Sequence, residues 1–339
     1  MKKLEDFLKP TQEELFKMLC KLFDSKAYKC DKNFILVEGE VPIMLVAHLD
    51  TVHQEPVREI CKSPDKNILM SPQGIGGDDR CGVYTLVNAY YSLLQKPWLL
   101  FTCDEEIGGI GADIFCHMHR ANKLPLGIDN LKCLIEIDRK GSNDAVYYEC
   151  DNPDFEKYIT SKGFKTAIGS FSDISVIAPE LGIAAVNLSS GYYNAHTLHE
   201  YINKSELDTI LIKVIDIVID ATKDDFPKYK YREKVYKFYD YEPGTYVRYY
   251  ESSKWQKWSN HKNDTKKSKA KHNNFDSYGI IEEDLFMKEL PSEYEELYEE
   301  LLTVYTKDEL EKERAHYGDR IIYELYVETF GPFYSYDQK

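Results

Sequence analysis

The chain has 339 residues, of which 43% are hydrophobic, and its 43 lysines and arginines against 58 aspartates and glutamates give a formal net charge of −15. Phosphate groups would repel so acidic a chain, which excludes a general nucleic-acid-binding function. The longest apolar runs, such as Ile43 to Ala47 and Ile215 to Ile219, are far too short to cross a membrane. We therefore expect neither nucleic acid nor a membrane as a partner.

Helices and strands are predicted to alternate along the first 225 residues. The first element is a helix, because Thr11 followed by Glu14 is typical of a capping box and apolar residues then recur at helical spacing. Short apolar runs predict buried strands at 34–37, 43–47, 99–102, 134–137 and 183–188. Helical patterns occupy roughly 80–95, 109–120, 153–162 and 173–180. A last amphipathic helix begins near Ser205, with Asp208 as partner in a weaker capping box. This alternation predicts an α/β sheet covered by helices on both faces.

The composition of the chain changes after about Phe226. We therefore predict a catalytic-type domain over 1–225, followed by a tyrosine-rich segment over 226–253. A lysine-rich stretch with almost no aliphatic residues, 254–275, is typical of a flexible linker. The last part, 276–339, is acidic and helix-forming, and we expect it to be a separate C-terminal α+β appendage that could bind a protein partner.

Eight cysteines are spread along the chain, and no two of them form a Cys-x-x-Cys pair. Several of these cysteines lie inside apolar, strand-like runs, so buried reduced thiols are expected in place of disulfides or a thiolate metal site. The N-terminal segment begins with two lysines, but Glu5, Asp6 and Lys9 interrupt any apolar stretch, so no secretory signal is predicted. These features predict a cytoplasmic protein.

Five short polar motifs lie where predicted strands end, and active sites of open α/β sheets form at the carboxyl ends of strands. The motifs are Val46–Val52, Gly76–Gly82, Phe101–Gly109, Ile135–Asp138 and Asn194–Tyr201. They supply imidazoles and carboxylates but no metal-binding cysteine pair, and such ligands suit Zn²⁺ or a related divalent ion. Two neighbouring ions need a bridging carboxylate and an additional base, and the adjacent Glu105 and Glu106 could divide such tasks.

Taken in order, these motifs resemble those of the co-catalytic di-zinc exopeptidases, a superfamily that includes peptidase T, the aminoacylases and the bacterial leucyl aminopeptidases. The matching residues are His48-Leu49-Asp50, the turn Asp78-Asp79-Arg80-Cys81-Gly82, Asp104-Glu105-Glu106-Ile107-Gly108, Asp138, and His196 with Glu200. The resemblance covers about residues 43–201. It implies a mixed, mostly parallel central sheet with helices on both faces.

The resemblance also implies a ligand set for two divalent metal ions. Asp78 would bridge both ions, His48 and Asp138 would complete one site, and Glu106 and His196 would complete the other. The ions are expected to be Zn²⁺, with Co²⁺ or Mn²⁺ as alternatives.

The catalytic roles are carried over in the same way. Glu105 would be the general base that takes a proton from the attacking water and later protonates the leaving amine. Asp50 would accept a hydrogen bond from the ring of His48 and fix its tautomer. The peptide bond between Asp78 and Asp79 would be cis.

One nearby histidine offers an alternative ligand. His199 lies directly beside Glu200, but the spacing in the superfamily places the ligand four residues before the glutamate, at His196. Glu200 would then support the site locally.

Two features depart from the pattern. In the peptidase T branch a lid or dimerisation domain of about a hundred residues follows the fourth motif, whereas here only 35 positions separate Asp138 from Asp173 in the next matching turn. The chain therefore lacks room for the lid, and we expect a compact monomer. Arg80 stands where lysine is common, and the two side chains differ in hydrogen-bond geometry.

The expected activity is that of a zinc-dependent metallopeptidase, an exopeptidase that cleaves a terminal residue from short peptides, with an aminopeptidase favoured. Two alternatives remain open at this point. The same chemistry could remove acyl groups from N-acyl amino acids, or the domain could be a catalytically inactive binding protein of the same fold.

Overall fold

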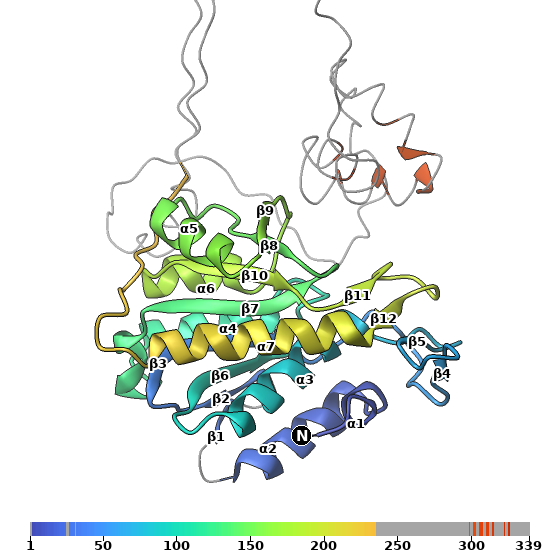
Figure 1. Cartoon of the computed structure of the whole chain (residues 1–339), viewed down its shortest axis with the longest axis horizontal. Helices are drawn as coiled ribbons and strands as arrows, with labels where there is room; N and C mark the ends of the chain where they lie inside the picture. The colour runs from blue at the N-terminus through green and yellow to red at the C-terminus, as the bar shows by residue number, and fades with distance from the viewer. Residues whose placement is uncertain are drawn as a thin grey trace, which may run out of the picture.

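The computed structural model describes residues 2–24, 27–30 and 32–234, together with a few positions between Tyr298 and Leu325. In this part of the chain a central sheet of eight strands has the order β1-β2-β6-β3-β7-β10-β8-β9 (Figure 1). The strands are β1 (Ala27–Cys30), β2 (Phe34–Val37), β3 (Val41–His48), β6 (Pro97–Thr102), β7 (Cys133–Arg139), β8 (Asp144–Val146), β9 (Lys165–Ala167) and β10 (Ala185–Ser189). The neighbours β6, β3, β7 and β10 run parallel, and β1, β2 and β8 join by antiparallel pairs. The predicted mixed, mostly parallel sheet is confirmed.

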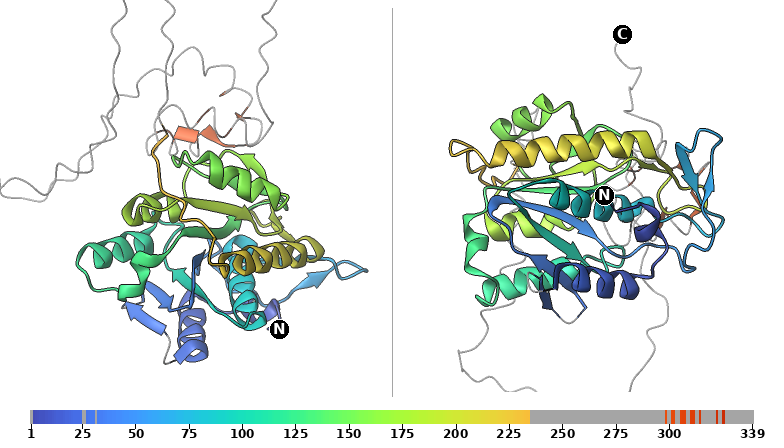
Figure 2. Two further views of the ribbon diagram at one scale, coloured as in Figure 1. Left: turned by 60° about the vertical axis from the view of Figure 1, so that its left-hand side comes forward. Right: turned by 60° about the horizontal axis from the view of Figure 1, so that its bottom comes forward.

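Helices cover both faces of the sheet, as predicted (Figures 1 and 2). One face carries α1 (Glu5–Leu8), α2 (Gln12–Phe23), α3 (Gly77–Ser92), α5 (Pro153–Ser161) and α7 (Lys204–Ala221). The other face carries α4 (Ile110–Arg120), the 3₁₀ helix η2 (Leu126–Asn130) and α6 (Ile174–Leu181). No helix in the described part of the chain is both long and apolar enough to cross a membrane.

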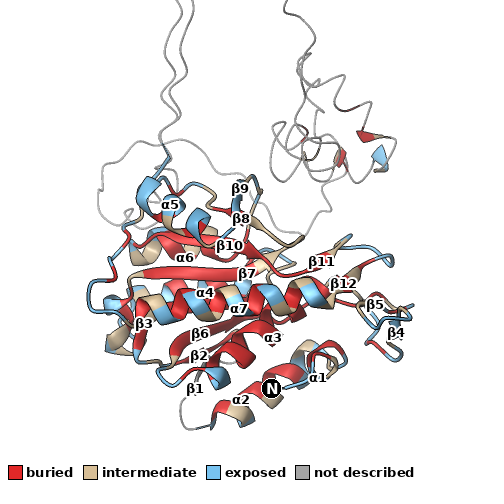
Figure 3. Cartoon of the chain, viewed as in Figure 1, coloured by how far each residue is buried: buried red, intermediate tan, exposed pale blue. Residues whose placement is uncertain are grey.

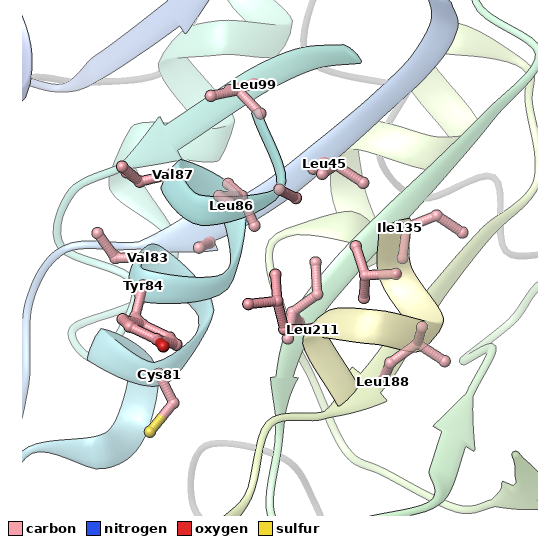
Figure 4. Close-up of a cluster of buried hydrophobic side chains, with 14 of the residues drawn as sticks. Leu45, Cys81, Val83, Tyr84, Leu86, Val87, Leu99, Ile135, Leu188 and Leu211 are labelled. Atoms are coloured by element: carbon pink, nitrogen blue, oxygen red, sulfur yellow. The ribbon is translucent and has the colours of Figure 1, made fainter. Parts of the chain in front are cut away.

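The parallel strands are largely apolar because both of their faces are buried (Figure 3). Along β3, Ile43 and Leu45 pack with α3 and α7, whereas Met44 and Val46 point to the face covered by α4 and α6. Figure 4 shows the first of these cores, in which Leu86 of α3 and Leu211 of α7 meet the sheet. Alternation of side chains along each strand therefore builds two cores from one continuous apolar run.

A second, four-stranded sheet lies beside the central one, on the right of Figure 1, in the order β11-β12-β5-β4. Its strands are β4 (Cys61–Lys62), β5 (Ile68–Met70), β11 (Tyr192–Tyr193) and β12 (Tyr201–Asn203). The antiparallel pairing of β12 with β5 connects the segment around residue 200 to the segment that leads into α3. The sheet therefore brings the second and fifth sequence motifs together.

The predicted start of the chain is confirmed in detail. Thr11 caps α2, and both hydrogen bonds of a capping box join it to Glu14. The predicted cap of the last helix is wrong, because α7 is capped by Asn203, whose side chain accepts from the backbone amide of Glu206. Asp208 pairs with Lys204 one turn earlier and makes no cap.

After α7 the described chain continues along the same domain as far as Lys234. Phe226 and Tyr229 are buried in the core of the α7 face, and the backbone of Lys230 bridges to Ile183. Further along, Leu301, Leu310 and Ile322 are buried in a cluster of their own. Almost all of the segments 226–253, 254–275 and 276–339 beyond Lys234 lie outside the described residues, so the predicted division of the chain stays a prediction.

Candidate metal centre

Three adjacent parallel strands end at the same edge of the sheet. His48 ends β3 opposite Thr102, the last residue of β6, and Val46 of β3 pairs with Glu136 of β7. The loop after β6 carries Glu105 and Glu106, and Asp138 lies near the end of β7. The strand register alone therefore brings an imidazole and several carboxylates to one place.

The carboxylate of Asp78 lies between two imidazoles. Its Oδ1 is 3.1 Å from Nε2 of His48, and its Oδ2 is 3.2 Å from Nε2 of His196. The Nε2 of His48 is also 3.5 Å from Oδ1 of Asp138, and the Nε2 of His196 is 3.1 Å from Oε2 of Glu106. The structure thus brings together all five side chains predicted as metal ligands.

The peptide bond between Asp78 and Asp79 is cis, as the resemblance implied. Asp79 is fully buried and accepts hydrogen bonds from the backbone amides of His48, at 3.3 Å, and Gly82, at 2.9 Å. Donor atoms of Asp79 also lie near His48 and Asp138, so a metal site that includes Asp79 is a geometric alternative. Because backbone donors already occupy both oxygens of Asp79, whereas those of Asp78 face two imidazoles, Asp78 is the better bridging group.

Asp50 connects the first motif to the third. Its Oδ1 is 3.2 Å from Nδ1 of His48 and accepts from the amide of Glu105 at 3.1 Å, and its Oδ2 accepts from the amide of Glu106 at 3.0 Å. Burial alone would raise the pKa of Asp50, but the hydrogen bonds from the His48 ring and from these two amides lower it. Asp50 is therefore a carboxylate that holds the ligand His48 and the Glu105–Glu106 loop together.

Glu105 lies at the same edge and is half-buried. Burial raises its pKa well above the ordinary value, and the negative charges of Asp138, Asp173 and Glu106 raise it further. Cations bound between these carboxylates would oppose this effect, because a bound cation stabilises the ionised form of its neighbours. The pKa of Glu105 therefore depends on the charge of the candidate ligands around it.

The two imidazoles bind protons strongly in the absence of a cation. Hydrogen bonds to the carboxylates of Asp78 and Glu106 raise the pKa of His196 to about 11. Burial opposes protonation of His48, but the charge of Asp138 and hydrogen bonds to three carboxylates outweigh it, and the pKa of His48 is raised. Burial and the charge of Asp78 raise the pKa of Asp138 to about 8. The cluster thus holds protons where cations could replace them.

These residues fit a divalent cation. Donor atoms of His48, Asp78 and Glu106 all lie within 4.8 Å of one another. Two ligands that each lie ~2.0–2.1 Å from a tetrahedral ion are about 3.3 Å apart, which is close to the imidazole–carboxylate spacings here. The Oε1 atom of Glu106 is buried without a hydrogen-bond partner, as expected of an oxygen that faces a cation. The donor set of nitrogen and oxygen atoms suits Zn²⁺, Co²⁺ or Mn²⁺.

Comparisons with known proteins address the fold. The aminopeptidase PepT from Bacillus cereus superimposes with a TM-score of 0.50 at 15% sequence identity, over 65% of this chain and 97% of that protein. A tripeptidase from Staphylococcus aureus matches with a TM-score of 0.48 at 15% identity, over 65% and 97% of the two chains. Aminopeptidase APDkam598 from the archaeon Desulfurococcus kamchatkensis matches with a TM-score of 0.49 at 13% identity, over 63% and 93%.

The chain has the fold of the aminopeptidase PepT from Bacillus cereus. No protein-family model matches the sequence. No curated protein matches it either. The expected fold is therefore confirmed by structure.

The segment that follows the fourth motif is short. The described residues between Asp138 and Ser170 form β8, α5 and β9, and no lid domain is among them. The expected monomer stays a prediction.

Arg80, the other departure from the pattern, is buried and donates from Nη1 to the carbonyl oxygens of Phe7 and Pro10, at 2.8 and 2.9 Å. It therefore anchors the N-terminal segment to the turn that carries Asp78.

The alternative ligand His199 is not part of the cluster. His199 is exposed, and its backbone amide donates to the side-chain hydroxyl of Thr197. Glu200, by contrast, is fully buried and accepts from the backbone amides of Gly76 and Asp78, each at 2.9 Å. Its predicted supporting role thus corresponds to contacts that hold the turn containing the bridging carboxylate.

The structure also reveals contacts that the sequence analysis did not predict. Gln12 of α2 exchanges two hydrogen bonds with Asp104, directly before the paired glutamates. Asn187 of β10 binds both backbone groups of Asp138, and the hydroxyl of Tyr192 is 3.3 Å from Oδ1 of Asp138. Gln12, Asn187 and Tyr192 belong to no recognisable motif, and only the fold brings them to Asp104 and Asp138.

A buried polar layer lies on the same face of the sheet as His48. Thr102 donates to Asp173, which precedes α6, and Ser172 donates to Glu136 of β7. Burial raises the pKa of Asp173 to about 6, and it raises the pKa of Glu136 as well. This layer ties the loop before α6 to the strands that carry the site.

Proposed function

We propose that the protein is a metal-dependent exopeptidase that hydrolyses the terminal peptide bond of short peptides, with a free N-terminus as the favoured end. The observation that supports this proposal most directly is the position of the Asp78 carboxylate, which presents one oxygen to His48 and the other to His196. A carboxylate in this position suits a bridge between two cations, and Asp138 and Glu106 extend the cluster on either side. The zinc-exopeptidase fold supports the same conclusion by analogy.

In this proposal His48, Asp78 and Asp138 hold one ion, and Asp78, Glu106 and His196 hold the other, with Zn²⁺ as the expected metal. Two such cations supply Lewis acidity, which polarises a substrate carbonyl and makes a water molecule more acidic at neutral pH. Glu105 takes a proton from the attacking water at its carboxylate and delivers it to the leaving amine. Asp50 keeps Nδ1 of His48 protonated, so that Nε2 is free to act as a ligand.

A cytoplasmic location belongs to the same proposal. Among the cysteines whose side chains the structure describes, none forms a disulfide, and Cys81, Cys103, Cys116, Cys133 and Cys150 are buried thiols. Free buried thiols are usual in a reducing compartment. Cys61 is exposed and differs in this respect from the expectation of burial.

The test uses the purified full-length protein with Zn²⁺, Co²⁺ or Mn²⁺ and two matched substrate panels. One panel contains dipeptides, tripeptides and aminoacyl anilides with a free amino group, and the other contains their N-acylated counterparts. We expect hydrolysis of the free-amine panel, its loss with a chelator and its return with added metal. The variant Glu105→Gln should bind metal and lose turnover, which separates this activity from a contaminating peptidase.

The panels also decide between the alternatives. Cleavage of only the acylated panel would assign an N-acyl-amino-acid amidohydrolase. Metal analysis with well under two equivalents, together with no chelator-sensitive turnover on either panel, would refute the enzyme and leave a binding protein of the same fold.

The role of the C-terminal part is tested by comparing a truncated chain with the full-length protein. Because Phe226 and Tyr229 belong to the core, a truncated chain should end at Lys234 and not at residue 225. Unchanged turnover with lost association would assign the removed part to binding of a protein partner, whereas altered substrate selectivity would assign it to the proposed active site.

A further inference from the structure

His53 lies outside every metal-ligand motif, yet it contacts the residue that holds the bridging carboxylate. Its Nε2 is 2.8 Å from Oε2 of Glu200, 147 positions away in the sequence. That carboxylate is fully buried, and its two oxygens also accept from the backbone amides of Gly76 and Asp78. A carboxylate oxygen can only accept here, so Nε2 of His53 is the donor.

The ring of His53 has little freedom to move. Only 9% of its side chain is exposed, and its backbone amide donates to Oγ1 of Thr51 at 3.2 Å. A Cβ atom on Gly74 would lie 2.2 Å from Cε1 and Nδ1 of the ring, and Gly74 has a positive φ of 81°. A glycine at this position therefore leaves the space that the imidazole fills, and the ring is held against the loop that leads into α3.

We propose that His53 is a positioning residue for the bridging carboxylate and acts on Asp78 through Glu200. This inference rests on the proposed function, because it concerns the same two-cation site. His53 fixes the Glu200 carboxylate by a third hydrogen bond, and Glu200 in turn fixes the backbone on both sides of Gly77. Without His53, the orientation of that buried carboxylate depends on two backbone amides among the residues that the structure describes.

The arrangement predicts how the loss of His53 would affect metal binding. Because Asp78 faces both His48 and His196, a shift of its backbone changes both halves of the site at once. Loss of a terminal ligand such as Glu106 would instead weaken one half. Loss of a residue that only packs would lower the stability of the fold and leave the affinity of the folded protein for both ions unchanged.

The test compares His53→Leu with His53→Gln in the full-length chain. Leucine removes the donor, whereas the glutamine amide can present an N–H to Glu200 near the position of Nε2. The control is His119→Leu, since His119 also contacts two carboxylates, those of Glu180 at 2.7 Å and Asp129 at 3.3 Å, but lies at the far end of α4. Zn²⁺ binding to the metal-free proteins is measured by calorimetry, Co²⁺ binding by visible absorption, and stability by denaturant unfolding.

We expect His53→Leu to weaken the binding of both ions by roughly 10- to 100-fold, the usual effect of losing an outer hydrogen bond at a metal site, and to change the Co²⁺ spectrum. His53→Gln should recover most of the affinity and the spectrum, and His119→Leu should bind as the unaltered protein does. Unchanged affinity for both ions in His53→Leu, weakening of only one ion, or a glutamine variant as weak as the leucine variant would overturn the inference. If the unaltered protein binds no metal, the proposed function fails first, and that outcome is distinct from these.

Discussion

Replacement of Gly82 by alanine tests whether close packing at the start of α3 holds the site. A Cβ atom at Gly82 would lie 2.3 Å from the backbone carbonyl oxygen of Ile137 and 2.4 Å from both carboxylate oxygens of Asp79. Neither neighbour can give way easily, because Ile137 belongs to β7 and Asp79 is fully buried and hydrogen-bonded to His48. An ordinary contact begins at 3.4 Å, so these atoms would have to separate by about 1 Å.

Two effects of opposite sign compete in this variant. Alanine in a helix is more favourable than glycine by ~1 kcal/mol. Overpacking of a close-packed site costs ~1–3 kcal/mol, and more where the neighbour is backbone. Because the carbonyl of Ile137 is sheet backbone that cannot move aside, we take the upper end of this range, about 3 kcal/mol, so the expected net loss in the free energy of unfolding is about 2 kcal/mol. The displaced Asp79 should also move the adjacent Asp78 and weaken metal binding by about 10- to 100-fold, as other outer contacts of metal ligands do.

The assay combines denaturant unfolding of the metal-free protein with calorimetric Zn²⁺ binding. Gly127→Ala is the control, because a Cβ there would lie 2.8 Å from the ring of Trp98, a side chain away from the site. The control should lose some stability and keep its affinity for Zn²⁺. If Gly82→Ala unfolds at the same or higher denaturant concentration than the unaltered protein and binds both ions normally, the packing argument for the Asp78–Asp79 turn is refuted.

Three further predictions follow from the site. Glu105→Gln should lower kcat by ~10²- to 10⁴-fold with metal binding retained, measured by steady-state kinetics and metal analysis, and a smaller fall would remove Glu105 as the general base. The pKa of His196 is raised to about 11 and that of His48 is also raised, so both imidazoles hold protons at pH 7 in the absence of metal. Zn²⁺ binding should therefore release protons and weaken as the pH falls. Calorimetry in buffers of different ionisation enthalpy measures that release, and an enthalpy independent of the buffer would contradict it. Arg80→Lys should expose the N-terminal segment to limited proteolysis, because one ammonium replaces the guanidinium that holds the carbonyls of Phe7 and Pro10, and unchanged proteolysis would show that these bonds do not anchor it.

The central sheet could be predicted from the sequence because its strands are buried on both faces. The run Phe34 to Val37 coincides with β2, and the predicted 43–47, 99–102 and 134–137 lie within β3, β6 and β7. Such runs are mostly apolar, so local composition is enough to find them. The second sheet escaped prediction since its strands are two or three residues long, which is too short for any periodicity to be read.

The candidate ligands could be predicted because each lies in a motif with its own local pattern. The contacts that orient them could not, because they join residues far apart in the chain. His53 and Glu200 are separated by 147 positions, and Gln12 and Asp104 by 92. No short-range signal marks Gln12 as different from any other polar residue of a first helical turn. Only the packing of α2 against the sheet gives its amide a partner.

Different parts of the fold position the two halves of the proposed site. His48 and Asp138 lie on paired parallel strands, and only 1% of the His48 side chain is exposed, so the sheet itself fixes this half. His196 lies in a loop between β11 and β12, with 57% of its side chain exposed, and meets Asp78 and Glu106 from outside the sheet. The shared Asp78 belongs to neither support, because it lies at the start of α3, where Asp78 and Asp79 have non-helical φ and ψ angles. The contacts around this irregular first turn set its position, so we expect the outer residues Asp79, Gly82 and Glu200 to influence both halves of the proposed site, although none of them is proposed to touch a metal ion.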